Sequence, residues 1–530
     1  MTDQAFDYVI VGAGSAGCVL AARLSEDGRR TVLLVESGPP DTSPLIAMPM
    51  GIGKLSTPGN PHYWHYSASQ GGNRREEAWV KGRTLGGSSS INGMVYVRGA
   101  ADDYDRWEAA GCTGWGWSTM KRCFIAIEDH ELGAADDRGT GGPLRVTMGR
   151  PPDPLGRAVI AAAAEAGTPT VDDLNGPQAT IRGGFGRQPR TISGGRRFSA
   201  ASAFLKPARH RRNLTVVTDT DVVDLIFDAH RVTGVRLRDT RGLRTVMARR
   251  EVILSAGAIE SPKLLQRAGI GPGALLTSLG IPVRVDAPGV GRNLREHRTV
   301  SISYRLTRGG YNAWLRGPGL YASALRYFLM RRGALTGSTF DLGGFVRTMP
   351  GLDRPDGQVG VGLFSFGPAG VSEHPGMTMF GYFMRPESQG RIEIRSPDPD
   401  QAPFIDANYL AAEKDRAHTV SLMRYIRRIG AQPALAPYVA GEVLPGADML
   451  SDDALIEASF TYGTSGYHVA GTCRMGSDTA AVVDPELRVR GVEGLRVVDT
   501  SVMPDLVSGN TNAPAMAIAW RAAERIMAGG

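Results

Sequence analysis

The hydrophobic pattern at the start of the chain predicts a strand, a turn, a helix and a second strand. Residues 8–11 form a short apolar run of the kind found in buried parallel strands. The following segment carries apolar positions at Val19, Leu20 and Leu24, which favours a helix, and a second apolar run covers residues 31–35. We therefore expect a β–turn–α–β unit at the amino end.

The turn between the first strand and the helix is rich in glycine. Gly12, Gly14 and Gly17 have the spacing G-x-G-x-x-G, and Glu36 follows the second strand, 19 residues after Gly17. Such glycines permit a tight turn, a close approach to a pyrophosphate and close helix–strand packing, while the acid binds a ribose diol. The pattern predicts a dinucleotide site for NAD, NADP or FAD, and NADP is the least favoured because Glu36 would repel a 2′-phosphate.

The next part of the chain predicts a continuation of the same α/β sheet. Residues 213–227 and 231–239 resemble a pair of strands, and residues 250–271 resemble a buried strand followed by a helix. Residues 39–78 show no clear periodicity and include an aromatic patch at 62–69. This patch is equally compatible with a loop that lies over a planar ligand and with ordinary packing under a long loop.

Later segments change character and predict a second domain with a large sheet, from residue 301 to residue 460. The remaining expected elements are helices at 154–167, 196–208, 412–430 and 514–526, helical segments within 102–130, strands at 377–384 and 391–396, and a strand that leads into a turn at 495–504.

Composition and charge exclude several classes of protein. The chain has 530 residues, 42% of them hydrophobic, and its net charge is +7 with a pI of about 9.3. Its arginines are scattered, without the aromatic-interleaved stripes or zinc-finger spacings of nucleic-acid binders, which favours a mildly basic surface and argues against a nucleic-acid partner. No apolar run reaches the roughly 18 residues of a membrane span.

The cysteines and the amino end predict a cytoplasmic location. Cys18, Cys112, Cys123 and Cys473 have no disulfide-framework spacing, and the first strand begins too early to leave room for a signal peptide. We expect reduced thiols in a cytoplasmic protein.

Six motifs in order along nearly the whole chain resemble the glucose–methanol–choline (GMC) family of FAD-dependent oxidoreductases. The second motif has Ala268 where the family usually has Ser. The motifs are GRTLGGSSSINGMVYVRG (82–99), GAIESPKLLQRAGIG (257–271), VGRNLREH (290–297), the segment 385–410, YHVAGTCRMG (467–476) and SGNTNAP (508–514).

The resemblance implies an α/β fold: a Rossmann-like FAD-binding domain with a discontinuous α+β substrate-binding domain built on a large antiparallel sheet. The implied FAD-binding segments are 1–158, 209–300 and 466–530, and the implied substrate-binding segments are 159–208 and 301–465. Covalently flavinylated members carry His where this chain has Ile91, so the resemblance implies noncovalent FAD.

The same resemblance assigns cofactor-binding residues. By this resemblance the set covers the pyrophosphate and ribose and the flavin side, the Val222 backbone pairs with the adenine, and Asp499 lies at the ribityl region. The implied residues are Gly12, Gly14, Ser15, Ala16, Gly17, Glu36, Ser37, Trp64, Arg83, Gly87, Ser88, Asn92, Gly93, Met94, Val95, Val222, Ala256, Tyr467, Asp499, Thr500, Asn512 and Pro514.

His468 is the candidate base for alcohol oxidation. Imidazole titrates near neutral pH, and the resemblance places the family's catalytic His at this position, although a lone His before a glycine turn is more often structural. Among the other histidines, His62, His65 and His297 are the least easily dismissed. The family's second catalytic position is assigned to Asn512, which would orient the substrate oxygen; an N-cap for the following helix is the structural alternative.

The substrate is predicted to be a primary alcohol of apolar or aromatic type. Tyr467, Phe364, Phe366 and Phe383 are equally compatible with an apolar wall of the pocket and with ordinary core packing. No carboxylate stands out as a partner for a quaternary ammonium group. Either O₂ or a quinone-type acceptor would reoxidise the flavin. The alternatives are a non-redox lyase of the same fold, like a hydroxynitrile lyase, a silent flavin-binding protein, and a nicotinamide dehydrogenase, which only the first motif supports.

Overall fold

The predicted β–turn–α–β unit forms the centre of the first of two seven-stranded sheets. The computed structural model describes residues 4–367 and 370–529. The unit consists of β1 (Gln4–Val11), α1 (Ser15–Leu24) and β2 (Val32–Val35), and β1 and β2 pair in parallel. The strand, helix and strand expected from the hydrophobic pattern are confirmed.

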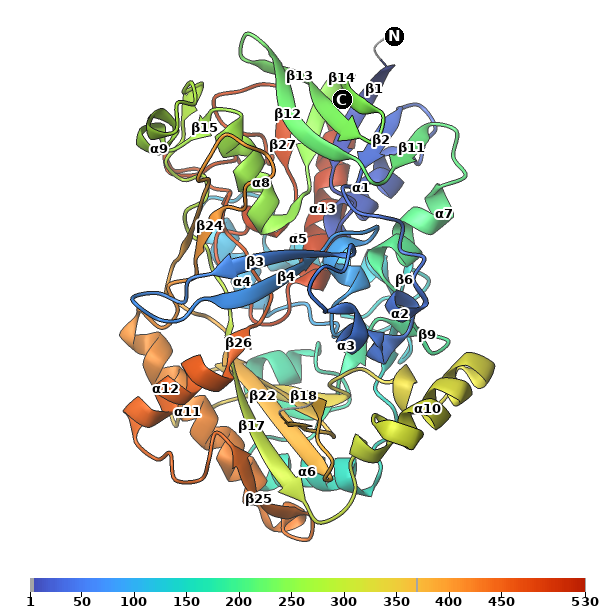
Figure 1. Ribbon diagram of the computed structural model, residues 1–530, viewed down its shortest axis with the longest axis vertical. Coiled ribbons are helices and arrows are strands. Elements are labelled where there is room, and N and C mark those ends of the chain that lie inside the picture. Colours follow the sequence, from blue (N-terminus) through green and yellow to red (C-terminus); the bar gives the residue numbers. More distant parts are fainter. Residues whose placement is uncertain (1–3, 368–369, 530) are drawn as a thin grey trace.

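Strands from two later parts of the chain complete this first sheet, which lies at the top of Figure 1. Its parallel core has the order β11-β2-β1-β14-β27. Strand β14 also pairs antiparallel with β13, which in turn pairs with β12. The added strands are β11 (Leu214–Val217), β12 (Asp221–Asp228), β13 (Arg231–Asp239), β14 (Gly242–Leu254) and β27 (Leu495–Val497).

Helices α1 and α13 (Asn512–Ala528) pack against each other beside this sheet, so the two ends of the chain share one core. The packing of α1 on β1 requires a glycine, because a Cβ on Gly17 would lie 1.9 Å from the carbonyl oxygen of Gly12. Helix α8 (Gly257–Arg267) begins directly after β14, as expected. Helices α4 (Ala101–Ala109) and α5 (Trp117–Ile127) confirm the helical segments within 102–130.

The second sheet is antiparallel and lies at the bottom of Figure 1. Helices α6 (Pro154–Glu165), α11 (Glu413–Gly430) and α12 (Asp452–Tyr462) pack against it around a separate hydrophobic core. Its strands, in spatial order, are β25 (Val439–Leu444), β17 (Arg298–Leu306), β22 (Gly376–Phe383), β19 (Gly357–Gly362), β18 (Leu342–Val346) and β7 (Gly184–Arg187), with β26 (Thr464–Ser465) paired to β17. The expected combination of a Rossmann-like sheet and a large antiparallel sheet is confirmed.

Helix α6 lies with the second sheet along its whole length. Its residues Leu155 and Val159 both belong to the core of that sheet. The boundary expected between residues 158 and 159 therefore runs through a single helix, and we propose that the substrate-binding segment begins before α6.

Two local predictions differ from the structure. Residues 62–69 do not form a loop: β3 (Tyr63–Ala68) pairs with β4 (Glu77–Gly82) in a hairpin between the two sheets (Figure 1). The helix expected at 196–208 is reduced to a π-helical turn at Ala201–Leu205 followed by α7 (Lys206–Ala208). In the described ranges, no helix has the length and apolar character that a membrane span needs.

Candidate active site

A large cavity lies between the two sheets and is lined by elements of both. Its volume is about 1220 Å³. Ordinary small-ligand pockets measure roughly 300–1,000 Å³, so this cavity is large enough for a dinucleotide together with a small substrate.

The amino end of α1 forms one end of the cavity, where the sequence predicts the nucleotide. Gly14, Ser15 and Ala16 line it, and no side chain caps the helix. A Cβ on Gly14 would have its nearest protein neighbour, the Ser255 carbonyl oxygen, 3.8 Å away, so the position faces open cavity. Uncapped N–H groups and the positive end of the helix dipole favour a phosphate here.

Glu36 stands at the end of β2, beside this phosphate position. Its carboxylate accepts hydrogen bonds from the backbone N–H groups of Ala13 (2.9 Å) and Gly38 (3.0 Å). Burial raises the pKa of Glu36 to about 7. A carboxyl group held in this way is suited to a ribose diol and unsuited to a second phosphate, which agrees with the preference against NADP.

The GGSSS loop (residues 86–90) and the residues that flank it form the opposite wall of this end. A Cβ on Gly87 would lie 2.7 Å from Gly14 Cα, so the loop contacts the start of α1 directly. Ser88 Oγ accepts a hydrogen bond from the Gly82 N–H (3.1 Å), and Asn92 Oδ1 accepts one from Arg197 Nη1 (2.8 Å). The loop is therefore a fixed wall of the cavity.

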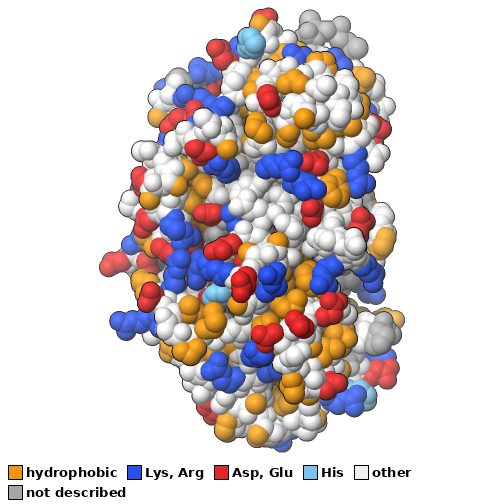
Figure 2. Space-filling view, turned by 90° about the vertical axis from the view of Figure 1, so that its left-hand side faces the viewer, with side chains coloured by type: hydrophobic (Ala, Val, Ile, Leu, Met, Phe, Trp, Pro, Cys, Tyr) orange, Lys and Arg blue, Asp and Glu red, His pale blue; other side chains and the backbone are white. Residues whose placement is uncertain are grey.

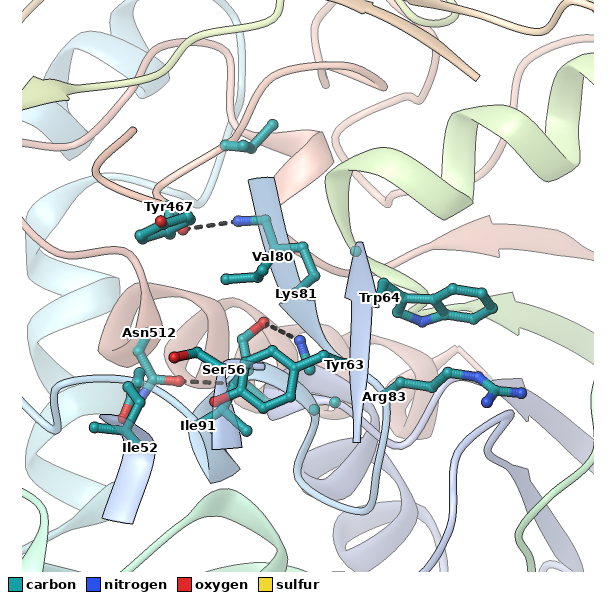
Figure 3. A pocket seen from close by; sticks show the side chains of 18 of the residues that line it. Ile52, Ser56, Tyr63, Trp64, Val80, Lys81, Arg83, Ile91, Tyr467 and Asn512 are labelled. Atoms are coloured by element: carbon teal, nitrogen blue, oxygen red, sulfur yellow. Dashed lines mark hydrogen bonds between the residues drawn. The ribbon is translucent and has the colours of Figure 1, made fainter. Parts of the chain in front are cut away.

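Nearly all the cofactor residues expected from the sequence meet at this cavity, several of them in Figure 3. Two do not line it: Gly17 packs against Gly12, and Pro514 is buried within the first turn of α13. Those that line it are Gly12, Gly14, Ser15, Ala16, Glu36, Ser37, Trp64, Arg83, Gly87, Ser88, Asn92, Gly93, Met94, Val95, Val222, Ala256, Tyr467, Asp499, Thr500 and Asn512.

Asp499 lines the cavity with its carboxylate already engaged. It accepts hydrogen bonds from the Gly257 N–H (2.9 Å) and the Ser261 hydroxyl (2.7 Å), both in α8. Asp499 therefore holds the amino end of α8 in place behind the nucleotide position.

His468 lies at the other end of the cavity and is almost fully buried. The residue before it, Tyr467, has a left-handed backbone (φ +61°), a conformation that non-glycine residues adopt mainly where the surrounding structure imposes it. Burial, together with His297 and Lys81, holds the pKa of His468 well below its ordinary value. The imidazole is therefore neutral at neutral pH and available as a base.

His297 determines which nitrogen of His468 is free. Its Nε2 lies 2.8 Å from the Met384 carbonyl oxygen, and its Nδ1 lies 2.9 Å from Nδ1 of His468. Because a carbonyl only accepts, His297 carries its proton on Nε2 and its bare Nδ1 accepts the Nδ1–H of His468. Burial lowers the pKa of His297 to about 3, which keeps it neutral.

The free Nε2 of His468 faces an asparagine amide. Asn510 Nδ2 lies 2.9 Å from this nitrogen, and Asn510 Oδ1 accepts from Gln358 Nε2 (3.0 Å). The Tyr382 hydroxyl donates in turn to Gln358 Oε1 (2.6 Å). This chain of bonds fixes the Asn510 amide with its NH₂ group toward His468.

The amide beside His468 is thus Asn510, two residues before the asparagine that the sequence singled out. Asn512 Oδ1 instead accepts a hydrogen bond from Ser15 Oγ (2.7 Å), which joins the amino ends of α13 and α1. It does not cap its helix with its side chain either, because the N-cap is Thr511. Both asparagines lie in one motif, and their order along the chain gave no means of choosing between them.

A buried acid and a lysine lie behind the two histidines. Glu296 Oε1 accepts from the backbone N–H groups of His468 (2.9 Å) and His297 (2.7 Å). Lys81 donates to the Tyr467 carbonyl oxygen (2.8 Å), as Figure 3 shows. Burial raises the pKa of Glu296 to about 7 and lowers that of Lys81 to about 8. Neither residue stands out in the sequence by its spacing, so neither was predicted to belong to the site.

The wall around the reactive end is aromatic. Phe364 and Phe366 line the cavity as expected, whereas Phe383 packs on His418 outside it. Phe340 and Phe380 also line it, with ring centroids 4.0 Å apart. In the part of the chain that the structure describes, the acidic residues that line the cavity belong to the first sheet or to segments next to it. They are Glu36, Asp221, Glu260, Asp400 and Asp499.

Comparisons with known proteins agree with this geometry. Family models described as GMC oxidoreductase match residues 6–299 and 386–519. The human "Choline dehydrogenase, mitochondrial" is 41% identical and covers 98% of this chain and 89% of its own length.

Solved structures share the fold. Pyridoxine 4-oxidase from Mesorbium loti has a TM-score of 0.87 at 32% identity and covers 98% of this chain and 99% of its own. A variant of formate oxidase from Aspergillus oryzae has a TM-score of 0.91 at 27% identity and covers 100% of this chain and 99% of its own.

Replacing Gly14 with Val should prevent nucleotide binding without unfolding the protein. The added side chain would project into the phosphate position, with its nearest protein neighbour at van der Waals distance (3.8 Å). Absorbance of nucleotide released from purified protein measures binding, and circular dichroism measures folding. Gly441→Val, at a strand position with open space around it, is the control. Full nucleotide content in Gly14→Val protein would contradict the assignment of this end.

Proposed function

This chain belongs to the GMC oxidoreductase family, and we propose that it oxidises a primary alcohol with an apolar or aromatic substituent to the aldehyde. It is an FAD-dependent oxidoreductase that acts on CH–OH groups. The observation that best supports the proposal is the free Nε2 of a neutral, buried His468 beside the Asn510 amide in the cavity.

We assign proton abstraction to His468. An alcohol whose oxygen takes the place of the direct Asn510–His468 bond would give its hydroxyl proton to Nε2, while the displaced amide donates a hydrogen bond to the same oxygen. Bound FAD supplies the acceptor for the hydride that leaves the α-carbon. The Nδ1–H of His468 stays bonded to His297 throughout, so the ring keeps its orientation when Nε2 becomes protonated.

The amino end of α13 supports the reaction electrostatically. Thr511, Asn512 and Ala515 line the cavity, so the positive end of the helix dipole faces it. Negative charge that develops in this part of the cavity during hydride transfer is therefore stabilised.

The aromatic wall supports the choice of substrate. Phe340, Phe364 and Phe380 offer apolar surface, and the described carboxylates of the lining lie at the nucleotide side. A neutral apolar or aromatic group on the alcohol would bury favourably here, whereas a cation would have no carboxylate partner at this wall.

Choline is the second candidate substrate, because the human relative at 41% identity carries that activity in its name. Aromatic faces such as those of Phe380 and Tyr382 bind quaternary ammonium groups through cation–π attraction. Direct comparison of choline with benzyl alcohol as reductants of the bound flavin distinguishes the two candidates.

The electron acceptor and the cellular location complete the proposal. We propose that O₂ or a quinone reoxidises the flavin and that the protein resides in the cytoplasm. The four cysteines, all buried and unpaired, support a reducing compartment.

The flavin should be released by acid precipitation. Ile91 lines the cavity and cannot form a bond to the isoalloxazine, so we propose noncovalent attachment. Yellow colour in the supernatant after precipitation is the expected result. Flavin that remains in the washed precipitate would contradict it.

Purified protein mixed anaerobically with a panel of alcohols should lose its flavin absorbance with the preferred alcohol. His468→Ala should slow this reduction by a factor on the order of 10²–10⁴ through loss of the base. Because burial lowers the pKa of His468, the rate for the native protein should fall only as the pH drops below the ordinary histidine value of about 6.5.

Unchanged reduction by His468→Ala protein with bound FAD would refute the assignment. A protein that no alcohol reduces, but that cleaves a cyanohydrin or lacks turnover, would support the lyase or the silent flavoprotein instead. Peroxide formed on admitting air identifies O₂ as an acceptor.

Asn510 and Asn512 should differ in their effects on rate and binding. Asn510→Ala removes the amide at His468 Nε2 and should slow flavin reduction by roughly 10- to 100-fold at full FAD occupancy. Asn512→Ala removes the bond to Ser15 and should weaken FAD retention while leaving the reduction rate per bound flavin nearly unchanged. The reverse pattern would return the catalytic role to Asn512.

A further inference from the structure

Helix α10 (Gly317–Met330) carries most of its large apolar side chains on the outside of the molecule. It protrudes at the lower right of Figure 1, in yellow. Only Ser323 and Tyr327 within the helix are buried, and the Tyr327 hydroxyl donates to the Ala47 carbonyl oxygen (3.3 Å). The helix is therefore attached along one narrow edge.

The exposed side chains form a stripe along the helix. Tyr321 is 79% exposed, Leu325 62%, Phe328 51% and Leu329 74%. Their spacing of i, i+4, i+7 and i+8 places them on one face. Isolated apolar residues on a surface are common, but a continuous stripe of large ones marks an interaction surface.

The charged residues of the segment that carries this stripe all have the same sign. Between Leu306 and Asp341 the sequence contains five arginines and no lysine, aspartate or glutamate. Arg316 pairs with Glu373, while Arg326 and Arg332 are exposed at the helix and its carboxyl end. By contrast, the face away from α10 carries basic and acidic side chains intermixed (Figure 2).

We propose that α10 docks the protein on an anionic lipid membrane surface, with its apolar stripe inserted among the lipids and its arginines at the headgroups. Amphipathic helices with aromatic and leucine side chains beside arginines bind at such interfaces. Each arginine near an anionic surface contributes about 1 kcal/mol of attraction.

Two other occupants fit the observations less well. A second copy of the chain in a two-fold contact across α10 would bring Arg326 and Arg332 of each copy close to those of the other, with no acid in the segment to neutralise them. A protein partner would need to enclose side chains that stand on a protruding helix, whereas a lipid surface accepts them without a complementary shape.

The docking surface lies beside the cavity. Leu315, Gly317 and Leu320, at the start of α10 and just before it, line the cavity wall. A membrane bound at α10 would therefore contact the element that borders the proposed substrate site, although docking itself does not depend on the proposed reaction.

Co-sedimentation of the full-length holoprotein with lipid vesicles tests the proposal. The protein should bind vesicles of equimolar phosphatidylcholine and phosphatidylglycerol, bind phosphatidylcholine vesicles much less, and lose affinity in high salt. Leu325→Gln with Leu329→Gln should lower the partition coefficient about tenfold or more. Arg326→Gln with Arg332→Gln should lower it about fivefold for each arginine on the anionic vesicles alone.

Matched controls lie on other elements. Leu243 and Leu450 are 62% and 68% exposed, so Leu243→Gln with Leu450→Gln removes equivalent apolar surface elsewhere. Arg29→Gln with Arg212→Gln removes the same charge from exposed positions outside α10. These controls should bind like the native protein, and all variants should keep their flavin content.

Three outcomes would overturn the proposal. Native protein that stays in the supernatant with anionic vesicles would exclude docking. If the control pairs lowered vesicle binding as much as the α10 pairs do, the binding would be general electrostatic attraction and would not be specific to α10. A native dimer by light scattering that Leu325→Gln with Leu329→Gln converts to monomer, without vesicle binding, assigns the stripe to a second copy.

Discussion

The hydrogen bond between the Nδ1 atoms of His297 and His468 is the contact on which the chemistry of the cavity depends. Two histidine nitrogens can share one proton only if one of them is bare, and the Met384 carbonyl oxygen requires that nitrogen to be His297 Nδ1. The tautomer of His468 then follows, and its Nε2 lone pair faces the cavity. A carbonyl next to strand β22 of the second sheet thus determines the protonation pattern of a residue that follows β26.

Electrostatics around this pair keep the base neutral before reaction. Burial and the neighbouring Lys81 both oppose a proton on His468, while Glu296 accepts hydrogen bonds from the backbone on both sides of the pair. Burial also shifts the pKa values of Glu296 and Lys81 toward neutral pH. Because burial and Lys81 both disfavour the protonated form, His468 is unprotonated before a substrate binds.

The sequence was most informative where the physical signal is local. The β–turn–α–β unit at residues 8–35 follows from apolar runs and from glycines whose Cβ atoms would clash within the unit itself, such as Gly17 against Gly12. It was least informative where apolar side chains face the cavity. In β3 the alternation is obscured because Trp64 and Tyr66 on one face and Tyr63 on the other are all aromatic and all line the cavity, so the segment resembled a loop.

Contacts across long separations could not be predicted from local patterns. His297 and His468 are 171 residues apart, and Gln358 reaches Asn510 across 152 residues. The choice between Asn510 and Asn512 depends on which way the chain turns before α13, where Gly509 has a left-handed backbone (φ +132°). Only the packed structure supplies that direction: the motif pointed to this segment and the role was assigned to Asn512, whereas Asn510 is the amide that lies beside His468.

The segment 510–512 connects the two ends of the cavity. Asn510 contacts His468 at the reactive end, and Asn512 contacts Ser15 at the amino end of α1, where the phosphate position lies. With only one residue between them, a displacement of α1 relative to α13 moves both amides together. A nucleotide bound at the proposed phosphate position would therefore lie against the helix whose Ser15 holds Asn512, two residues from the amide beside His468.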